Sequence, residues 1–268
     1  MLVGGPVAIA WSISVLVHPP LRVIAALWAA VALVFEFVCF TPLQKSWRLR
    51  AAKIQEVFDC DVLDLPWNAI KAGHRPAPEE VHENAEKYIR HDDGSFPLEN
   101  WYPPAVGELP LGLARIVCQR SNCRWDANQR FRYAHWIGGS AIAIFAAILL
   151  SGYALGATLP SSFLTIAPAL PLVVVGIRHL TEQREAASRL ATLQQDLDDL
   201  WSQALLGQSE DSLAQSARQV QDEIFQNRKA STPVFDFVYA LLQRHSEVQM
   251  VRSAQDLIQD ARQANRRD

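Results

Sequence analysis

The sequence predicts an all-α membrane protein with two transmembrane hairpins, four membrane-crossing helices in all, and a cytosolic helical domain. Three observations predict this fold. Half of the 268 residues are hydrophobic although the mean hydropathy is near zero. Residues 133–177 contain no Asp, Glu, Lys or Arg, whereas residues 178–268 are dense in Gln, Asp, Glu and Arg. Apolar and polar residues are therefore segregated along the chain, which is not typical of a soluble enzyme.

Each membrane crossing requires a long apolar helix. About 20 apolar residues span a bilayer core of about 30 Å, and unpaired backbone amides make other open structures too costly in lipid. Four runs meet or approach this length: residues 2–17, 21–40, 136–158 and 163–180. The first run lacks the charged start and the cleavage site of a secretory signal, so we expect it to be a retained membrane segment.

The charges between the runs predict the orientation, because Lys and Arg near helix ends stay in the cytoplasm. The first hairpin tip carries only His18 and Arg22, and the second carries no charge. Bases gather at the opposite ends of the runs: Lys45, Arg48, Arg50, Lys53, Arg120, Arg124, Arg130, Arg132, Arg178, Arg184 and Arg189. We therefore expect both termini in the cytoplasm and four segments: a hairpin in 1–43, a cytosolic segment in 44–132, a hairpin in 133–180 and a cytosolic C-terminal region in 181–268.

Glu36 is the one acid inside an apolar run. An intramembrane carboxylate costs a few kcal/mol and indicates a functional role by default. Two interpretations stay open here. Glu36 either lines a pore or pairs helices, or it anchors the helix at the interface, where Lys45 or interfacial water can reach it.

The sequence predicts helices and one loop for the cytosolic segment between the hairpins. Leu43, Trp47, Ile54 and Phe58 follow helical spacing, which predicts that a helix over 44–58 continues from the second crossing. It should end between Asp61 and Pro66, because a residue before proline is driven out of the α region. Three further segments follow: a short helix over 76–91, a loop over 91–110 and a helix over 109–133 that enters the third crossing.

The C-terminal region begins with a short heptad seam: Leu190, Leu193, Leu197, Leu200 and Ala204. Such a stripe packs either against the first cytosolic helices or against a neighbouring subunit. The "GQSEDS" segment (207–212) predicts a break, after which Asp211 or Ser212 caps the next helix. Another helix is expected from Pro233, and a polar helix over 246–262.

Signatures of catalysis and of metal binding are missing. The chain has no Gly-rich phosphate loop, GxSxG, HExxH or CxxC motif. The four cysteines are expected to be reduced packing residues. The polar cluster of His74, His82, His91, Asp92 and Asp93 is best interpreted as a solvated loop. We expect no enzyme activity, metal or cofactor, and the net charge of −3 gives no reason to expect DNA as a partner.

Aromatic and basic residues are unusually frequent in polar surroundings. They are Trp67 and Asn68, Trp101 and Tyr102, Trp125 with Asp126 and Arg130, and Arg228 with Lys229. Aromatic faces beside Arg can stack a nucleobase and hold a phosphate. The alternative is that the Trp residues form the core of a small domain and a belt at the membrane interface.

Four motifs in this order resemble the SMODS-associating four-transmembrane effector family: "IQEVFDCDVLDLPWN" (54–68), "WYP" (101–103), "NCRWDANQRFRY" (122–133) and "FQNRKASTPVFDFVY" (225–239). The resemblance implies a role in bacterial anti-phage systems, in which a nucleotidyltransferase makes a cyclic or linear oligonucleotide signal and the effector damages the inner membrane. Relatives usually have a cytosolic helical segment before the first crossing, which implies a truncated or mis-started N-terminus here.

The family pattern falls on ligand-binding or latch candidates: Asp59, Asp61, Trp67, Asn68, Trp125, Asp126, Arg130, Arg228 and Lys229. The acids at 59, 61 and 64 repel phosphate, so this stretch is expected to be a structural latch instead of an anion site. In the latch, Asp59 or Asp61 pairs with Arg124, Arg130 or Arg228, and Trp67 packs the turn.

The expected function is therefore membrane disruption or pore formation in the bacterial inner membrane, with a homo-oligomer as the active form. The alternative is a non-lytic membrane adaptor that recruits a cytosolic partner through the stripe over residues 190–204 and the polar C-terminal helices. An anchored hydrolase is a third and weaker candidate, for want of a nucleophile or a metal constellation.

Overall fold

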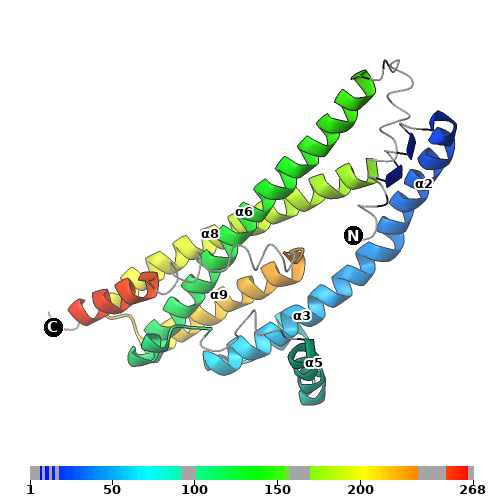
Figure 1. Cartoon of the computed structure of the whole chain (residues 1–268). Coiled ribbons are helices and arrows are strands. Elements are labelled where there is room, and N and C mark those ends of the chain that lie inside the picture. The colour runs from blue at the N-terminus through cyan, green and yellow to red at the C-terminus, as the bar shows by residue number, and fades with distance from the viewer. Residues whose placement is uncertain are drawn as a thin grey trace. The chain divides into compact units, whose positions relative to one another are not determined.

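The computed structural model describes residues 7, 10–11, 14–15, 18–91, 101–154, 156, 170–234 and 252–264. All regular elements in these ranges are helices, and the described part of the chain contains no strand (Figure 1). The all-α prediction is confirmed for these residues.

The N-terminal part of the described chain is one long helical stretch. A 3-10 turn, η1 (Pro19–Leu21), leads into α2 (Arg22–Phe35), the π-helix η2 (Glu36–Phe40) and α3 (Thr41–Val62). The predicted continuation of the second apolar run into a polar helix is therefore confirmed. The helix ends at Val62, within the expected interval, and Asp64 adopts a left-handed backbone with φ 49° shortly before Pro66.

Three short elements follow: α4 (Ala69–Ala72), α5 (Pro78–His91) and η3 (Pro104–Glu108). The α5 helix begins two residues later than predicted, with Pro78 at its start and two acids in its first turn. The predicted loop over 91–110 is wrong at 104–108, where prolines preset the backbone for a 3-10 turn. Residues 92–100 of that loop lie outside the described residues.

Two long helices and one shorter helix follow: α6 (Leu111–Ala154), α8 (Leu170–Leu205) and α9 (Glu210–Ala230). The predicted run of the 109–133 helix into the third apolar segment is confirmed, because α6 is continuous. The cap prediction for α9 is wrong. Ser209 occupies the N-cap position in an extended conformation, so the helix starts at Glu210, and Asp211 lies in its first turn, where acids favour the helix dipole.

The last described helix covers 252–264. It overlaps the predicted polar helix over 246–262, of which residues 246–251 lie outside the described residues. The described residues 231–234 are not helical, and the helix expected from Pro233 lies outside the described residues from 235 on.

Two helical stretches are long and apolar enough to cross a membrane, Val23–Val62 and Leu111–Ser151. They overlap the second predicted crossing over residues 23–40 and the third over residues 136–151. The first predicted crossing, 2–17, lies largely outside the described residues. So does the start of the fourth, of which residues 170–180 begin α8. Four crossings and the hairpin layout therefore remain predictions.

The chain divides into two compact units. Unit 1 contains residues 1–46 and 132–184, and unit 2 contains residues 47–131 and 185–268. These divisions lie close to the boundaries predicted from the sequence. That unit 1 lies in a membrane and unit 2 in the cytoplasm stays a prediction.

Unit 2 has an apolar core, which takes residues from α3, α6, α8, α9 and the 252–264 helix. The leucine seam of α8 packs into this core: Leu190, Leu197 and Leu200 are buried, and Leu193 and Ala204 pack against them. Of the two interpretations of the seam, intramolecular packing is confirmed. The four cysteines are free thiols, three of them buried and Cys39 exposed.

Candidate functional site

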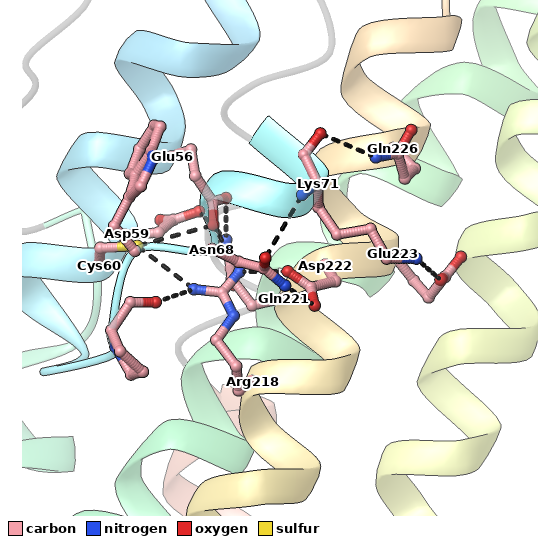
Figure 2. A network of polar contacts seen from close by, with 12 residues as sticks. Glu56, Asp59, Cys60, Asn68, Lys71, Arg218, Gln221, Asp222, Glu223 and Gln226 are labelled. Carbon is pink, nitrogen blue, oxygen red and sulfur yellow. Dashed lines mark hydrogen bonds and ion pairs between the residues drawn. The ribbon is translucent and has the colours of Figure 1, made fainter. Parts of the chain in front are cut away.

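Unit 2 buries a set of polar side chains between α3 and α9. Glu56 and Asp59 of α3 are each only 1% exposed, and Gln221 of α9 is fully buried. Buried carboxylates are costly unless other groups donate hydrogen bonds to them. Figure 2 shows how α9 supplies such donors, with Gln221 and Arg218 pointing toward the two acids of α3. We call Glu56, Asp59, Arg218, Gln221, Asp222 and Arg228 the polar network.

Gln221 links the two acids of α3. Its side-chain amide lies 2.9 Å from an oxygen of Glu56 and 2.8 Å from Oδ2 of Asp59, and donates to both. Its carbonyl oxygen accepts from Gln119 of α6 at 3.2 Å, and Gln119 also donates to the backbone carbonyl of Ala217 at 2.8 Å. One glutamine therefore orients two carboxylates and connects three helices of unit 2.

Arg218 makes a second set of contacts, to Glu56 and to Asp222 of its own helix. Its Nη2 lies 2.6 Å from Glu56 and 2.9 Å from Asp222. Its Nη1 donates to the backbone carbonyl of Pro66 at 2.9 Å and lies 3.3 Å from the sulfur of Cys60. The guanidinium thus ties α9 to α3 and to the turn that follows α3. Burial opposes its charge, but Glu56, Cys60 and Asp222 together outweigh burial, so the pKa of Arg218 is raised.

Asp59 is the acceptor of a third set of contacts. Arg228 Nη1 donates to its Oδ2 at 2.6 Å, and the hydroxyl of Tyr102 donates to its Oδ1 at 3.0 Å. Burial opposes the charge of Arg228, but Asp59, Tyr102 and Asp126 together outweigh burial, so the pKa of Arg228 is raised. Burial, and then the Asp59 carboxylate, raise the pKa of Tyr102 well above its ordinary value. Tyr102 therefore remains a neutral donor.

The turn after α3 is fixed by Trp67 and Asn68. The indole nitrogen of Trp67 donates to the carbonyl of Gly73 at 2.9 Å. Asn68 caps α4 by accepting from the amides of residues 70 and 71, and its amide nitrogen donates to Asp222 at 2.7 Å. The predicted packing of the turn by Trp67 is present, and Asn68 joins that turn to the polar network.

The geometry shows what the network can do. Three carboxylates face two guanidiniums, and each guanidinium is already engaged by at least one carboxylate at 2.6 Å. A phosphate would have to displace these carboxylates before it reached either arginine. The arrangement therefore resembles a closed clasp between α3 and α9 more than an open anion site. Removing one partner of such a buried pair is strongly destabilising.

The sequence left several pairings open, and the structure contains one of them. Asp59 contacts Arg228, whereas Asp61 pairs with the exposed Arg75 at 2.6 Å. Of the other arginines proposed for the latch, the one at 124 has no hydrogen-bond or ion-pair partner among the described residues. Arg130 lies 2.8 Å from Asp126 and donates to the carbonyl of Thr232 at 3.0 Å. Whether the Asp59 contact works as a latch stays a prediction.

The aromatic and basic candidates are arranged as packing groups. Trp125 packs edge-on against Trp101 at 5.8 Å between ring centroids. Trp67 lies below the guanidinium of Arg75 at 5.9 Å. Lys229 is exposed at the end of α9. Trp67 packs against the apolar core of unit 2, whereas Trp101 and Trp125 are half-buried, so the core interpretation applies to Trp67 and base stacking by the others stays a prediction.

Sequence reasoning missed four members of the polar network: Glu56, Arg218, Gln221 and Asp222. Tyr102 was identified only as an aromatic residue beside Trp101. A signal was present in α9, where Leu213, Ala217 and Ile224 mark a buried stripe. Gln221 occupies the position in that stripe between 217 and 224. A glutamine inside an apolar stripe indicates a buried polar partner on a neighbouring helix.

Glu36 of unit 1 lies in η2 and pairs with Arg178 of α8 at 2.9 Å. Arg178 also donates to the hydroxyl of Thr41 at 3.3 Å and lies 5.5 Å from the ring centroid of Phe37. The π-helix places Glu36 and Thr41 on the side that Arg178 approaches. The partner is therefore Arg178 and not Lys45, and the helix-pairing interpretation is supported for the described residues.

No group of three or more His, Cys, Asp or Glu within the described residues is arranged to hold a metal ion. Of the polar cluster considered from the sequence, Asp92 and Asp93 lie outside that part of the chain.

Comparison with known proteins gives two matches. A family model, the SMODS-associating 4TM effector domain, matches residues 1–257. A curated protein of Bacillus cereus (strain VD146), described as a probable CBASS effector molecule, is 22% identical over 232 residues, which cover 86% of this chain and 75% of that protein. No solved structure matches. Because the family model spans nearly the whole sequence, the chain belongs to the SMODS-associating 4TM effector family.

Proposed function

We propose that this chain is an effector of bacterial anti-phage defence that permeabilises the inner membrane when it is activated. Membership of the effector family and the similarity to a probable CBASS effector molecule support the defence role. Two apolar helical stretches long enough to cross a bilayer support a membrane location. In this proposal the chain is multi-pass, both termini are cytoplasmic, and no catalytic step is required.

The observation that carries the mechanism is the continuity of the helix from α2 through η2 to α3. Its N-terminal part is apolar enough for lipid, and its C-terminal part carries Glu56 and Asp59 of the polar network. A displacement of α3 from α9 is therefore transmitted along one helix toward the apolar stretch. The closed network holds the resting state, and its opening favours a leaky state.

The activator in this proposal is a cyclic or linear oligonucleotide, and the active form is a homo-oligomer. The nucleotide acts either by displacing a carboxylate from Arg218 or Arg228 or by binding elsewhere on unit 2. Both routes require that the bound ligand favour the open network over the closed one. DNA is not part of the proposal.

The alternative, a non-lytic adaptor, would recruit its partner through the stripe over residues 190–204 and the polar C-terminal helices. Leu190, Leu197 and Leu200 are buried in the core of unit 2, so this stripe is not available to a partner in the described structure. That observation favours the effector over the adaptor.

Dye release from liposomes tests the proposal. The purified chain is inserted into vesicles loaded with a self-quenching dye, and a panel of cyclic di- and trinucleotides and linear oligonucleotides is added. Release that depends on one nucleotide is the expected result. Verified insertion with no release for any nucleotide would contradict the proposed function.

A further inference from the structure

The structure divides the Lys and Arg residues that flank the apolar runs into two groups. Most are tied to carboxylates, side-chain amides or backbone carbonyls: Arg48, Arg50, Lys53, Arg120, Arg130, Arg178 and Arg189. Four have no hydrogen-bond or ion-pair partner among the described residues: Lys45, Arg124, Arg132 and Arg184. Three of these four, Lys45, Arg132 and Arg184, belong to unit 1.

Contacts inside unit 1 fix the relative heights of its helices. Arg178 of α8 contacts both Glu36 and Thr41, which lie about one turn apart on the same helix. Thr41, the end of that turn nearer Lys45, serves as the reference level. A Cβ atom added to Gly138 of α6 would lie 3.3 Å from the side chain of Leu180 of α8, and one added to Gly176 would lie 3.5 Å from Ala141. Since the α6 numbers rise as the α8 numbers fall, the two helices are antiparallel at this contact.

The three unpaired cations then lie at nearly one level. With a helical rise of 1.5 Å per residue, Lys45 lies ~6 Å beyond the level of Arg178, Arg184 ~9 Å and Arg132 ~12 Å, all in the same direction. They are spread over ~6 Å of height, which is about one helical turn. The headgroup layer on each side of a bilayer is about 5–7 Å thick, so this spread matches one layer.

The residues near the cations have the composition expected at a membrane–water boundary, with an exposed Trp close to the cations and an apolar segment on the membrane side. Trp136 is 64% exposed and lies ~6 Å beyond the level of Arg178, at the height of Lys45, where an amphipathic ring belongs at a membrane–water boundary. On the side away from the cations, the segment from residue 133 to residue 177 contains no Asp, Glu, Lys or Arg. The surface thus changes from an apolar stretch to a layer that holds both Trp136 and the unpaired cations.

We propose that Lys45, Arg132 and Arg184 form a headgroup ring that binds the phosphates of anionic phospholipids in one leaflet. The inference rests on the membrane location in the proposed function. Lys45 and Arg184 are exposed and come from different helices, so they suit an extended layer of phosphates better than one small anion in a pocket. The ring sets the depth of unit 1 and makes its membrane contacts sensitive to anionic lipid.

Native mass spectrometry of the chain released from vesicles of equal phosphatidylglycerol and phosphatidylcholine tests the ring. The parent should retain phosphatidylglycerol preferentially. Lys45→Gln, Arg132→Gln and Arg184→Gln should each reduce this enrichment about fivefold, because a base near an anionic surface contributes on that scale. These side chains have no partner among the described residues, so the substitutions should leave thermal unfolding unchanged.

A matched control carries Arg50→Gln, Lys87→Gln and Arg90→Gln. It changes the net charge by the same amount as the triple ring variant, but its bases are already paired with Glu80, Glu83 and Glu86 at 2.7 Å each. Retention of the enrichment in this control, with loss in the ring variant, supports the ring. An equal loss in both, or no loss in the ring variant, would overturn it.

Competition separates lipid from soluble phosphate as the ligand. Inorganic phosphate or a cyclic dinucleotide should not displace phosphatidylglycerol from the parent, and displacement by either would overturn the lipid assignment. Extraction of the parent from vesicles by alkaline carbonate would contradict both the ring and the membrane function. Stable insertion without lipid preference would contradict the ring alone.

Discussion

Replacing Asp59 with Asn is the most informative single change in the polar network. The substitution keeps the size of the side chain and removes its charge. Asp59 accepts from Arg228 and Gln221 at Oδ2 and from Tyr102 at Oδ1. The amide of Asn offers one acceptor oxygen where the carboxylate offers two.

The orientation of the new amide determines how much Asp59→Asn lowers the free energy of unfolding. If its oxygen takes the Oδ2 position, the contacts with Arg228 and Gln221 persist, and the hydroxyl of Tyr102 can turn to accept. The remaining loss is the charge that faces Arg228. Removing one partner of a buried ion pair costs about 3–5 kcal/mol, and the retained hydrogen bonds place Asp59→Asn at the lower end, ~3 kcal/mol.

Asp61→Asn is the matched control, because it makes the same chemical change on the same helix at an exposed position. Its partner Arg75 and its own side chain are 46% and 60% exposed. An exposed ion pair contributes only ~0–1 kcal/mol. Thermal unfolding in detergent, followed by Trp fluorescence and calibrated with a denaturant series, should therefore separate the two variants by ~2 kcal/mol or more. Equal unfolding free energies for the two variants would refute the assignment of the buried pair.

Other contacts give three more predictions. Glu36→Gln removes the nearer of the two carboxylates of Arg178 and leaves only Glu182 at 3.7 Å, so basal dye release should rise. The double variant with Arg178→Gln should return toward the parent, and an additive pair of effects would contradict the pairing. Burial raises the pKa of Tyr102, so the unfolded chain loses the hydroxyl proton near pH 10 while the folded chain keeps it, and the free energy of unfolding should fall as pH rises above about 10. Tyr102→Phe should reduce this fall. An unchanged pH slope of the unfolding free energy in the variant would count against the raised pKa. Asn68→Ala removes the cap of α4 and a donor to Asp222, which should cost ~1–3 kcal/mol in the same unfolding assay, and a cost below ~0.5 kcal/mol would show that the turn is held by other contacts.

Local signals in the sequence were sufficient for most of the helices. The spacing of Trp47, Ile54 and Phe58 and the proline at 66 predicted both the course and the end of α3. The leucine stripe of α8 predicted a buried seam. The start of α9 was misplaced because Ser209, a good N-cap residue, precedes the residues that were expected to cap the helix.

The polar network was only partly predictable. Opposite charge suggested that Asp59 meets an arginine, but three arginines were equally eligible by sequence, and the choice of Arg228 depends on how α3 packs against α9. Gln221 and Glu56 were missed because a polar residue on a helix is assigned to the solvent side unless a partner is known. Tertiary packing brings that partner close, and a single sequence does not show which helices will pack together.

The bases near the apolar runs show a related limit. The positive-inside rule treats Arg48, Arg130 and Lys45 alike. In the structure the first two are bound to other groups of the chain, and Lys45 has no partner among the described residues. Sequence gives the sign of the charge near a membrane, whereas side-chain contacts identify which charges are free to meet lipid.

The proposed mechanism requires that the polar network restrain a membrane-permeabilising state. The decisive quantity is the rate of dye release, without any nucleotide, from vesicles that contain equal amounts of inserted parent, Asp59→Asn or Asp61→Asn chain. If the whole loss of ~3 kcal/mol destabilises the resting state relative to the leaky state, the population of the leaky state rises up to about 150-fold in Asp59→Asn. Basal release should therefore be much faster for Asp59→Asn than for the parent, with Asp61→Asn close to the parent. Equal basal rates for all three, with folding and insertion verified, would contradict the restraint.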